Sequence, residues 1–350
     1  MSGFASVPID TWTQRVGAFA ALPALIRELG SDPFTALSAA RLAPDALDDP
    51  GGRITYQALG RFLDLAAERT QCAHIGLLAG RFWHLRDLGL LGGLALNSAT
   101  VGDALHALVH HQHLNSEGGA AFLMERGDWT DFGYAIYCPN VPGANQIADA
   151  VVAGGFNYMR ELSGGGWQPT AVLLAHAPPC DVSPHRALFK LTPRFDTDCS
   201  ALRFPTRWME TRVAGADIRR LRRLEARAAA VDDGAVVKRV CRALRIGLAT
   251  GGSSGNDIAK ALHINRRTLN RHLEAAGTTF QELLDDVRYA TARQLLAGSH
   301  LPLDDVAAAL GYGGVTQFMR RFRCWSGGSP GDWRRKVQRA DASALAAGTA

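Results

Sequence analysis

The sequence predicts an α+β N-terminal domain followed by an all-α C-terminal domain, in which two helix-turn-helix units are joined by a long helix. Three observations support this fold class. Helix-like and strand-like patterns are mixed in the first 215 residues, whereas the pattern after residue 235 is mostly helical. Basic residues are concentrated in the second part. A short helical segment there recurs 48 positions later.

Composition limits the classes of protein to which the chain can belong. Hydrophobic residues make up 47% of the 350 residues, as in ordinary globular chains. No apolar run reaches the ~18 residues of a membrane-spanning helix, and the first residues lack the pattern of a secretion signal. The six cysteines form no Cys-x-x-Cys pair, which fits a reducing compartment. We therefore expect a cytoplasmic protein without membrane contact, cofactor or bound metal.

The first 215 residues alternate between two kinds of pattern. Helices are predicted where apolar residues recur three and four positions apart. They cover Val16–Leu29, Tyr56–Ala67 and Val101–His113. Strands are predicted where aromatic and β-branched residues gather between turn residues. They cover Ala120–Glu125, Phe132–Cys138, Thr170–Leu174 and Leu202–Phe204, and the first two form a hairpin around Gly127-Asp128.

Charge is distributed unevenly along the chain. Between Val236 and Val337 there are sixteen Lys and Arg residues and eight Asp and Glu residues, although the net charge of the whole chain is only +5. A basic segment beside a slightly acidic remainder indicates that this segment binds a polyanion such as nucleic acid. Nearly every cation is Arg, so the presence of an Arg is not by itself a sign of a DNA contact.

The internal repeat lies inside the basic segment. Residues 257–273 are matched by residues 305–322, with one residue inserted, and each copy reads as a short helix, a tight turn and a second helix. The second helix of each copy has two apolar residues four positions apart, which would face the core. These pairs are Leu269 with Leu273 and Phe318 with Phe322. The residues between them are left exposed.

Polar residues follow the turn of the first copy. Asn265 is a good helix N-cap, so side chains from the early turns of the second helix would project outward. These side chains are Arg266, Arg267, Asn270 and Arg271. Arg can bond a guanine edge through two hydrogen bonds and Asn can bond an adenine edge in the same way. A predicted helix over Phe280–Ala297 would hold the two copies apart, so that they enter successive major grooves about 34 Å apart.

These motifs resemble a known family. The first copy carries Ile264-Asn265-x-Arg267-Thr268-Leu269, and the second carries Asp305-Val306-Ala307-x-x-Leu310-Gly311-Tyr312 followed by Phe318-x-Arg320-x-Phe322. Residues 257–335 thereby resemble the C-terminal domain of the AraC/XylS transcription regulators. Upstream, Arg160-x-x-x-Gly164 and Trp167-x-Pro169 are similar to the arabinose-binding-like effector domain of one branch of that family.

The resemblance implies a domain organisation and a function. Residues 1–215 would form an effector-sensing and dimerisation domain, 216–235 a linker, 236–338 the double helix-turn-helix DNA-binding domain and 339–350 a disordered tail. The chain would be a transcription factor, not an enzyme, that binds specific promoter DNA and responds to a small molecule of unknown identity. RNA polymerase and a second copy in a homodimer are the further partners that the resemblance suggests.

The expected DNA contacts follow from the helix positions. Base-reading contacts are predicted for Arg267, Asn270, Arg271, Thr316, Gln317 and Arg320, and phosphate contacts for Arg266, Arg321 and Arg323. One feature departs from the family pattern, because Gly313 and Gly314 stand where a capping Ser and a polar residue are usual. We therefore expect the first copy to supply most of the base discrimination and the second to anchor through Arg320 and Arg321.

Two other binding functions remain open from the sequence. His106, His110 and His113 would share one face of the helix predicted over Val101–His113, and imidazole suits zinc, copper or nickel. The alternative function is therefore a metal- or cofactor-binding sensor for which DNA binding is secondary. A third possibility is a basic architectural protein without sequence preference. Trp129, Tyr134 and Trp167 could line an effector pocket or simply fill the core.

Enzyme motifs give little support to a catalytic function. Gly-x-Ser-x-Gly occurs at Gly251–Gly255 and again at Gly327–Gly331. A nucleophile elbow requires a preceding strand, and neither segment follows a predicted strand. Both are interpreted as chance matches.

Overall fold

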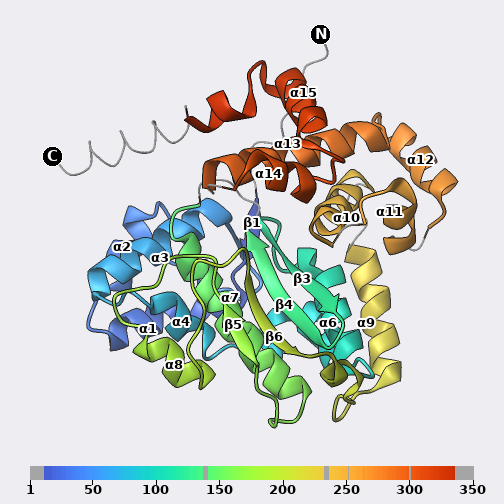
Figure 1. Ribbon diagram of the computed structural model, residues 1–350. Helices are drawn as coiled ribbons and strands as arrows, with labels where there is room; N and C mark the ends of the chain where they lie inside the picture. Colours follow the sequence, from blue (N-terminus) through green and yellow to red (C-terminus); the bar gives the residue numbers. More distant parts are fainter. Residues whose placement is uncertain are drawn as a thin grey trace. The chain divides into compact units, whose positions relative to one another are not determined.

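The computed structural model in Figure 1 describes residues 12–136, 141–231, 236–250, 252–262, 264–298 and 301–335. The chain divides into two units, residues 1–231 and 232–350. The first contains helices and two sheets, and the described part of the second is all helix, which confirms the predicted fold class. The predicted tail 339–350 and Cys138, the predicted end of a strand, lie outside the described residues.

The first unit is built on a four-stranded antiparallel sheet in the order β3-β4-β6-β5. Its strands are β3 (Gly119–Arg126), β4 (Trp129–Ile136), β5 (Ala171–Leu173) and β6 (Ser200–Pro205). The predicted hairpin is confirmed, with Arg126 opposite Trp129 across the turn at Gly127 and Asp128. A second sheet pairs β1 (Thr13–Arg15) with β2 (Arg53–Thr55), and the sequence pattern did not predict it.

The described part of the first unit also contains nine α-helices. They are α1 (Leu22–Glu28), α2 (Pro33–Ala39), α3 (Tyr56–Thr70), α4 (Ile75–Gly80), α5 (Leu90–Leu96), α6 (Val101–His110), α7 (Ala144–Leu162), α8 (Ser183–Phe189) and α9 (Ile218–Val231). Short 3-10 helices are η2 (Gly17–Ala21), η3 (Leu85–Leu88), η4 (Gln112–Leu114) and η5 (Thr206–Glu210). The prediction of one helix over Val16–Leu29 was wrong, because the 3-10 helix η2 precedes α1, and Pro23 in the first turn of α1 has no N–H to continue the earlier turn.

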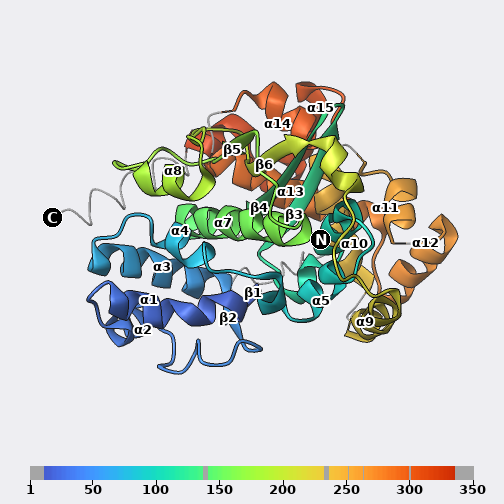
Figure 2. The same cartoon turned by 90° about the horizontal axis from the view of Figure 1, so that it is seen from below.

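Helix α7 is the centre of the first unit. Figure 2 shows it between the four-stranded sheet and the layer of α1–α3. Phe132 and Tyr134 of β4 belong to the large core on the side of α7, whereas alternate residues such as Phe122 form a small separate cluster on the opposite face. Glycines allow α4 to approach α7, since a Cβ at Gly76 would lie 2.0 Å from a carbonyl oxygen of α7.

The second unit has two cores that share one helix. Its helices are α10 (Val236–Thr250), α11 (Gly255–Ala261), α12 (Arg266–Ala275), α13 (Phe280–Gly298), α14 (Leu303–Ala309) and α15 (Val315–Ser326). The first half of α13 packs with α10–α12 through Leu283 and Val287. Its second half packs with α14 and α15 through Ala292 and Leu296. The long helix predicted between the copies is therefore confirmed.

The two helix-turn-helix copies bury the predicted pairs. Leu269 and Leu273 of α12 are fully buried, as are Phe318 and Phe322 of α15. The Asn265 side chain caps α12 by accepting the Thr268 N–H at 2.8 Å, as predicted. At α15 the N-cap residue is Gly314, which offers no side-chain oxygen. The first turn of α12 therefore has a side-chain cap that the first turn of α15 lacks.

Arg288 connects the middle of α13 to the second copy. Its Nε donates to the Leu310 carbonyl at 2.9 Å and one Nη donates to the Gly311 carbonyl at 3.2 Å. Its guanidinium also lies over the Tyr312 ring, 4.5 Å from the centroid. These contacts satisfy carbonyls at the C-terminal end of α14 and give Arg288 a structural role.

The difference in capping predicts opposite effects of two substitutions. Replacing the cap with Asn265→Ala should destabilise α12 by roughly 0.5–2 kcal/mol, because the Thr268 N–H loses its acceptor. Gly314→Asp should stabilise α15 by a few tenths of a kcal/mol, since Gly314 has an extended backbone (φ 173°) and open space around it. Amide hydrogen exchange in α12 and α15 of the full chain measures both effects, and faster exchange in α15 of Gly314→Asp would contradict the capping argument.

Candidate nucleic-acid interface and ligand pocket

The residues predicted to contact bases in the first copy lie on α12. Arg267, Asn270 and Arg271 are all exposed and fall on one side of this helix, opposite the buried Leu269 and Leu273. The i, i+3, i+4 spacing places the three side chains next to one another. This face can therefore present two guanidinium groups and one amide to a ligand at the same time.

The corresponding face of α15 is less basic. Thr316, Gln317 and Arg320 are exposed on it, and Arg323 is exposed near the end of the helix. Gln317 and Arg320 also line a hollow between α13 and α15, together with Arg288 and Arg321. Three guanidinium groups and the Asp285 carboxylate line this hollow, and Arg321 is paired with Asp285.

Two of the predicted phosphate ligands have partners inside the unit. Arg266 is half-buried, and its guanidinium lies over the Phe280 ring, 4.2 Å from the centroid. Arg321 forms an ion pair with the mostly buried Asp285 of α13. Both side chains therefore hold their helices against the rest of the unit, whereas Arg323 is exposed and is attracted to Asp332.

The histidine cluster is not arranged as the sequence predicted. Helix α6 ends at His110, and His113 belongs to the separate turn η4, so the prediction that His106, His110 and His113 share one helical face was wrong. The Nε2 atom of His106 instead lies 3.9 Å from Oε1 of Glu125. Among the described residues, no group of three or more His, Cys, Asp or Glu side chains is arranged to hold a metal ion.

The serine motifs of the second unit serve as helix starts. The first precedes α11, where the Ser254 hydroxyl accepts the Asp257 N–H at 3.2 Å. In the second, the Ser329 hydroxyl accepts the Asp332 N–H at 3.1 Å. Within the described part of the chain neither segment follows a strand, so the geometry of a nucleophile elbow is missing.

The first unit encloses a pocket beside α7. Its walls come from α7, from β3, β4 and β6, and from the η2, η3 and η4 turns. The pocket offers about 60 Å³ to the centres of water molecules. One water requires roughly 10–15 Å³ on that scale, so the pocket can hold several waters or a small organic molecule. Among the described residues that line the pocket there is no Asp, Glu, His, Lys or Arg.

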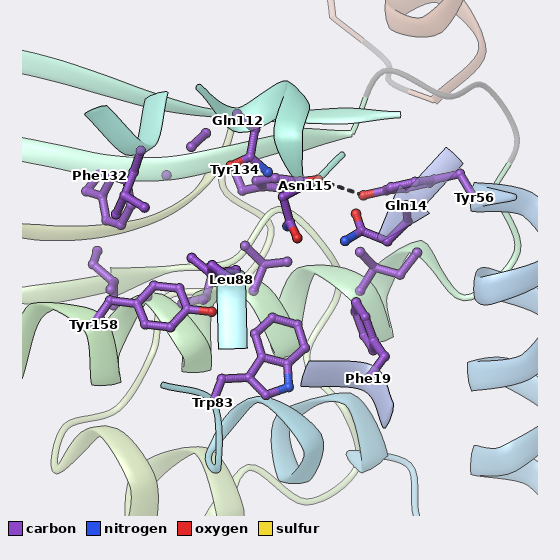
Figure 3. Close-up of a pocket in the computed structure, with 18 residues that line it drawn as sticks. Gln14, Phe19, Tyr56, Trp83, Leu88, Gln112, Asn115, Phe132, Tyr134 and Tyr158 are labelled. Carbon is purple, nitrogen blue, oxygen red and sulfur yellow. Dashed lines mark hydrogen bonds between the residues drawn. The ribbon is translucent and has the colours of Figure 1, made fainter. Parts of the chain in front are cut away.

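Polar groups are gathered on part of the pocket wall. The Tyr134 hydroxyl lies 3.0 Å from the Tyr56 hydroxyl and donates to the Ser116 hydroxyl at 3.1 Å. Figure 3 shows the amides of Gln14 and Asn115 on the same side, directed into the cavity. Of the three aromatic residues considered for a pocket, Tyr134 lines it, Trp167 is fully buried in the core and Trp129 is 44% exposed at the start of β4.

A second cluster of polar side chains joins α7 to α8 and the segment before it. Asp149 of α7 is bonded to His176 at 3.0 Å and to His185 at 3.1 Å. Burial opposes the charged form of Asp149, but the hydrogen bonds from the two histidines outweigh it and lower the pKa of Asp149. Burial likewise opposes the charged form of His176, and its bond to Asp149 raises the pKa of His176 above the ordinary value.

Comparison with known families shows what the chain is. The family model for the arabinose-binding N-terminal domain of the AraC transcription regulator matches residues 30–213. The chain belongs to the AraC family of transcription regulators. A helix-turn-helix domain model matches residues 258–336, so this family member binds DNA through its second unit. The two matched segments therefore lie in the two parts of the chain that the sequence motifs indicated.

Several relatives and one solved structure are similar to this family member. The Ornithine utilization regulator of Pseudomonas aeruginosa is 28% identical over 90% of this chain and 94% of its own length. The HTH-type transcriptional regulator VirS of Mycobacterium tuberculosis is 27% identical over 89% of this chain and 93% of its own. The crystal structure of the transcriptional regulator CdpR from Pseudomonas aeruginosa is 22% identical, covers 88% of this chain and 97% of its own, and has a TM-score of 0.42.

Family membership settles the class of function. The chain is a helix-turn-helix transcription regulator with an N-terminal effector-binding domain, as the motifs predicted. The relatives named above are regulators as well, and no observation supports the metal- or cofactor-sensor alternative within the described residues. None of the described helices combines the length and apolarity needed to cross a bilayer.

The Asp149 cluster predicts a pH-dependent cost of Asp149→Asn. The lowered pKa of Asp149 gives stability that is present above about pH 4 and is lost as the pH falls through the folded-state pKa. The raised pKa of His176 gives stability that is full below about pH 6.5 and is lost as the pH rises through its folded-state pKa. The substitution should therefore cost about 3 kcal/mol of unfolding free energy at pH 6 and clearly less at pH 9, measured by urea denaturation.

Asp131→Asn is the matched control for this measurement. Asp131 is as deeply buried as Asp149, but its partner is Arg203, which bonds it at 2.7 and 2.8 Å and stays charged at both pH values. Its penalty should be the same at pH 6 and pH 9. If Asp149→Asn also costs the same at both pH values, the ion pair with His176 does not contribute as described.

Proposed function

We propose that α12 and α15 bind adjacent major grooves of a promoter and that an effector bound by the first unit changes the affinity of this contact. The observation that carries the proposal is the exposed set Arg267, Asn270 and Arg271 on α12, held outward by the fully buried Leu269 and Leu273. A helix of this kind presents its N-terminal half to base edges when it lies in a major groove. Guanidinium and amide groups are the side chains that read guanine and adenine.

The two copies would contribute unequally to the sequence preference. The first turn of α12 is fixed by the Asn265 cap, whereas α15 starts at the uncapped Gly314. The base-facing residues of α15 are Thr316, Gln317 and Arg320, of which only Arg320 is charged. We therefore assign most base discrimination to Arg267, Asn270 and Arg271, and a weaker contribution to the α15 residues.

Phosphate binding would come mainly from exposed arginines. Arg323 is exposed, and Arg320 lines the hollow between α13 and α15. Arg266 and Arg321 are already engaged with Phe280 and Asp285, so they would act chiefly by keeping α12 and α15 in place. Contacts to phosphate set the position of a protein on the duplex and carry no base preference of their own.

Regulation needs a second site that favours one state of the protein. An effector can change DNA affinity only if it binds one arrangement of the chain more tightly than another. The first unit, matched by the effector-domain model, is the part proposed to bind it. From the family resemblance we also propose a homodimer and a contact with RNA polymerase. The chain would act on DNA in the cytoplasm and would not be an enzyme.

The division of labour between the copies predicts how two substitutions change the selected sites. Arg267→Ala should relax the base preference at the positions read by α12 and cost roughly 1–3 kcal/mol of specific binding. Thr316→Ala should change the preference less, because a single hydroxyl forms fewer base contacts than a guanidinium group. Selection of sites from a random duplex library by the full chain and by each variant gives the comparison.

Two results of that selection would overturn the proposal. A greater loss of base preference in Thr316→Ala than in Arg267→Ala would reject the assignment of discrimination to α12. Equal binding of the native chain to selected and random duplexes would favour the architectural protein without sequence preference.

Phosphate binding predicts a steep dependence of affinity on salt. Each phosphate neutralised by a cationic side chain contributes about 0.9 to the slope of log affinity against log salt concentration. Arg323→Ala should therefore reduce this slope by about 1 and weaken binding to all duplexes alike. Arg266→Ala should reduce this slope by less, because the Arg266 guanidinium of the native chain already lies over the Phe280 ring. Titrations of one selected duplex between low and physiological salt test this, and a flat response of the native chain would contradict it.

A further inference from the structure

The pocket of the first unit has features that define the chemistry of its ligand. We propose that it binds an uncharged, flat compound of one or two rings, with a hydrogen-bond acceptor that reaches the Tyr158 hydroxyl. This inference deepens the proposed function, since such a compound would be the effector. It differs from the sugar in the name of the family model and from the amino acid in the name of one relative.

The first observation is a buried donor without a partner. The Tyr158 hydroxyl lies in the wall of the pocket and has no hydrogen-bond partner among the described residues. Tyr158 is only 6% exposed, so bulk water does not satisfy its hydroxyl. A buried polar group without a partner costs about 1–3 kcal/mol, which a ligand that bonds it would relieve. Figure 3 shows the Tyr158 hydroxyl directed toward Leu88 and the interior of the cavity.

The second observation is the lack of charged side chains in the pocket wall. Its described lining residues include no Asp, Glu, Lys, Arg or His. Burial raises the pKa of the Tyr134 and Tyr158 hydroxyls, and the carboxylates of Asp87 and Glu161, which are not part of the lining, raise that of Tyr158 further, so both phenols stay neutral at physiological pH. A carboxylate would lose its hydration here without a cationic partner, which is strongly unfavourable. The pocket therefore disfavours amino acids, organic acids and phosphorylated compounds.

The third observation concerns the shape and polarity of the walls. Phe19, Trp83 and Phe132 give flat surfaces, and Val151, Val152 and Leu202 give aliphatic ones. A sugar has a hydroxyl on almost every carbon, and the hydroxyls that lie against these apolar walls, away from Gln14, Asn115 and Tyr134, would have no partner. A ring compound would instead bury its faces against the aromatic walls and leave its acceptor to Tyr158.

Gly155 provides a way to close the pocket without disturbing the fold. It lies on α7 in the pocket wall, and a Cβ there would meet Leu202 at 3.4 Å and Phe132 at 3.5 Å, which are ordinary contact distances. Gly155→Ala should therefore fold, and Ala also favours the helix. Its added methyl group occupies space that the ligand would need.

The experiment titrates the full chain with defined probes by calorimetry, in the absence of DNA. Acetophenone and coumarin are neutral ring compounds with a carbonyl acceptor. Benzoate matches acetophenone in size but carries a charge, while L-arabinose and L-ornithine represent a polyol and a charged amino acid. We expect acetophenone or coumarin to bind and the other three probes to bind at least tenfold more weakly.

Two variants locate the binding site of the neutral probe. Tyr158→Phe keeps the ring and removes the donor, so it should weaken the bound probe about threefold to tenfold. Gly155→Ala should weaken it at least as much. The controls are Tyr289→Phe, which removes a hydroxyl from the second unit, and Gly166→Ala, which adds a methyl group in open space. Neither control should change the affinity.

The outcomes separate the ligand class from the regulatory function. Failure of both neutral probes to bind, tighter binding of benzoate, arabinose or ornithine, or full affinity in both Tyr158→Phe and Gly155→Ala would overturn the inference. A parallel titration of a selected duplex, with and without the neutral probe, tests regulation separately. If the probe binds in the pocket but leaves DNA affinity unchanged, the ligand class stands and the proposed effector control fails.

Discussion

The shared helix α13 is the constraint on which the second unit depends. Leu283 and Val287 belong to the core of the first copy, and Ala292 and Leu296 to the core of the second. Two small cores that could otherwise move independently are thus built on one continuous helix. Arg288, near the middle of α13, bonds the carbonyls at the end of α14 and fixes the second copy further. The separation of α12 and α15 is therefore set by the geometry of α13 and not by a flexible connection.

Helix α7 has a comparable role in the first unit. It packs against the four-stranded sheet on one side and against α3 and α4 on the other (Figure 2). The same helix supplies Val151, Gly155 and Tyr158 to the pocket, and Asp149 to the histidine cluster. A ligand in the pocket would therefore contact the element that organises most of the core. A packed interior transmits strain, so binding would also affect residues beyond the pocket.

Much of the second unit could be predicted from the sequence, because its signals are local. The N-cap Asn265 precedes its helix directly, and the i, i+4 pairs such as Phe318 and Phe322 require only helical periodicity. The repeat doubled the signal of the buried pairs, whereas the N-cap is present only in the first copy. The hairpin of β3 and β4 was predictable for the same reason, since a two-residue polar turn separates two apolar strands.

The rest depends on contacts between distant segments. Helix α7 was not predicted, and its burial on most sides, including at Gln146 and Asp149, becomes visible only in the fold. The end of α6 at His110 has no Pro or Gly to mark it, which is why His113 was placed on the wrong element. The pocket joins residues from Gln14 to Leu202, and only the fold brings them together.

The internal partners of two arginines show a further limit of the sequence. Arg266 and Arg321 occupy helix positions that favour phosphate contact, yet the structure engages them with Phe280 and Asp285. Position along a helix says which way a side chain leaves the backbone, but not where a long flexible side chain ends. Such roles become visible only when the neighbouring helix is in place.

The central claim is that one rigid unit inserts two helices into one side of a duplex. Hydroxyl-radical footprinting of the full chain on a selected site measures this directly. The account predicts two protected patches on the same face of the DNA, with centres about 10 base pairs apart. A single patch, or two patches on opposite faces, would contradict it.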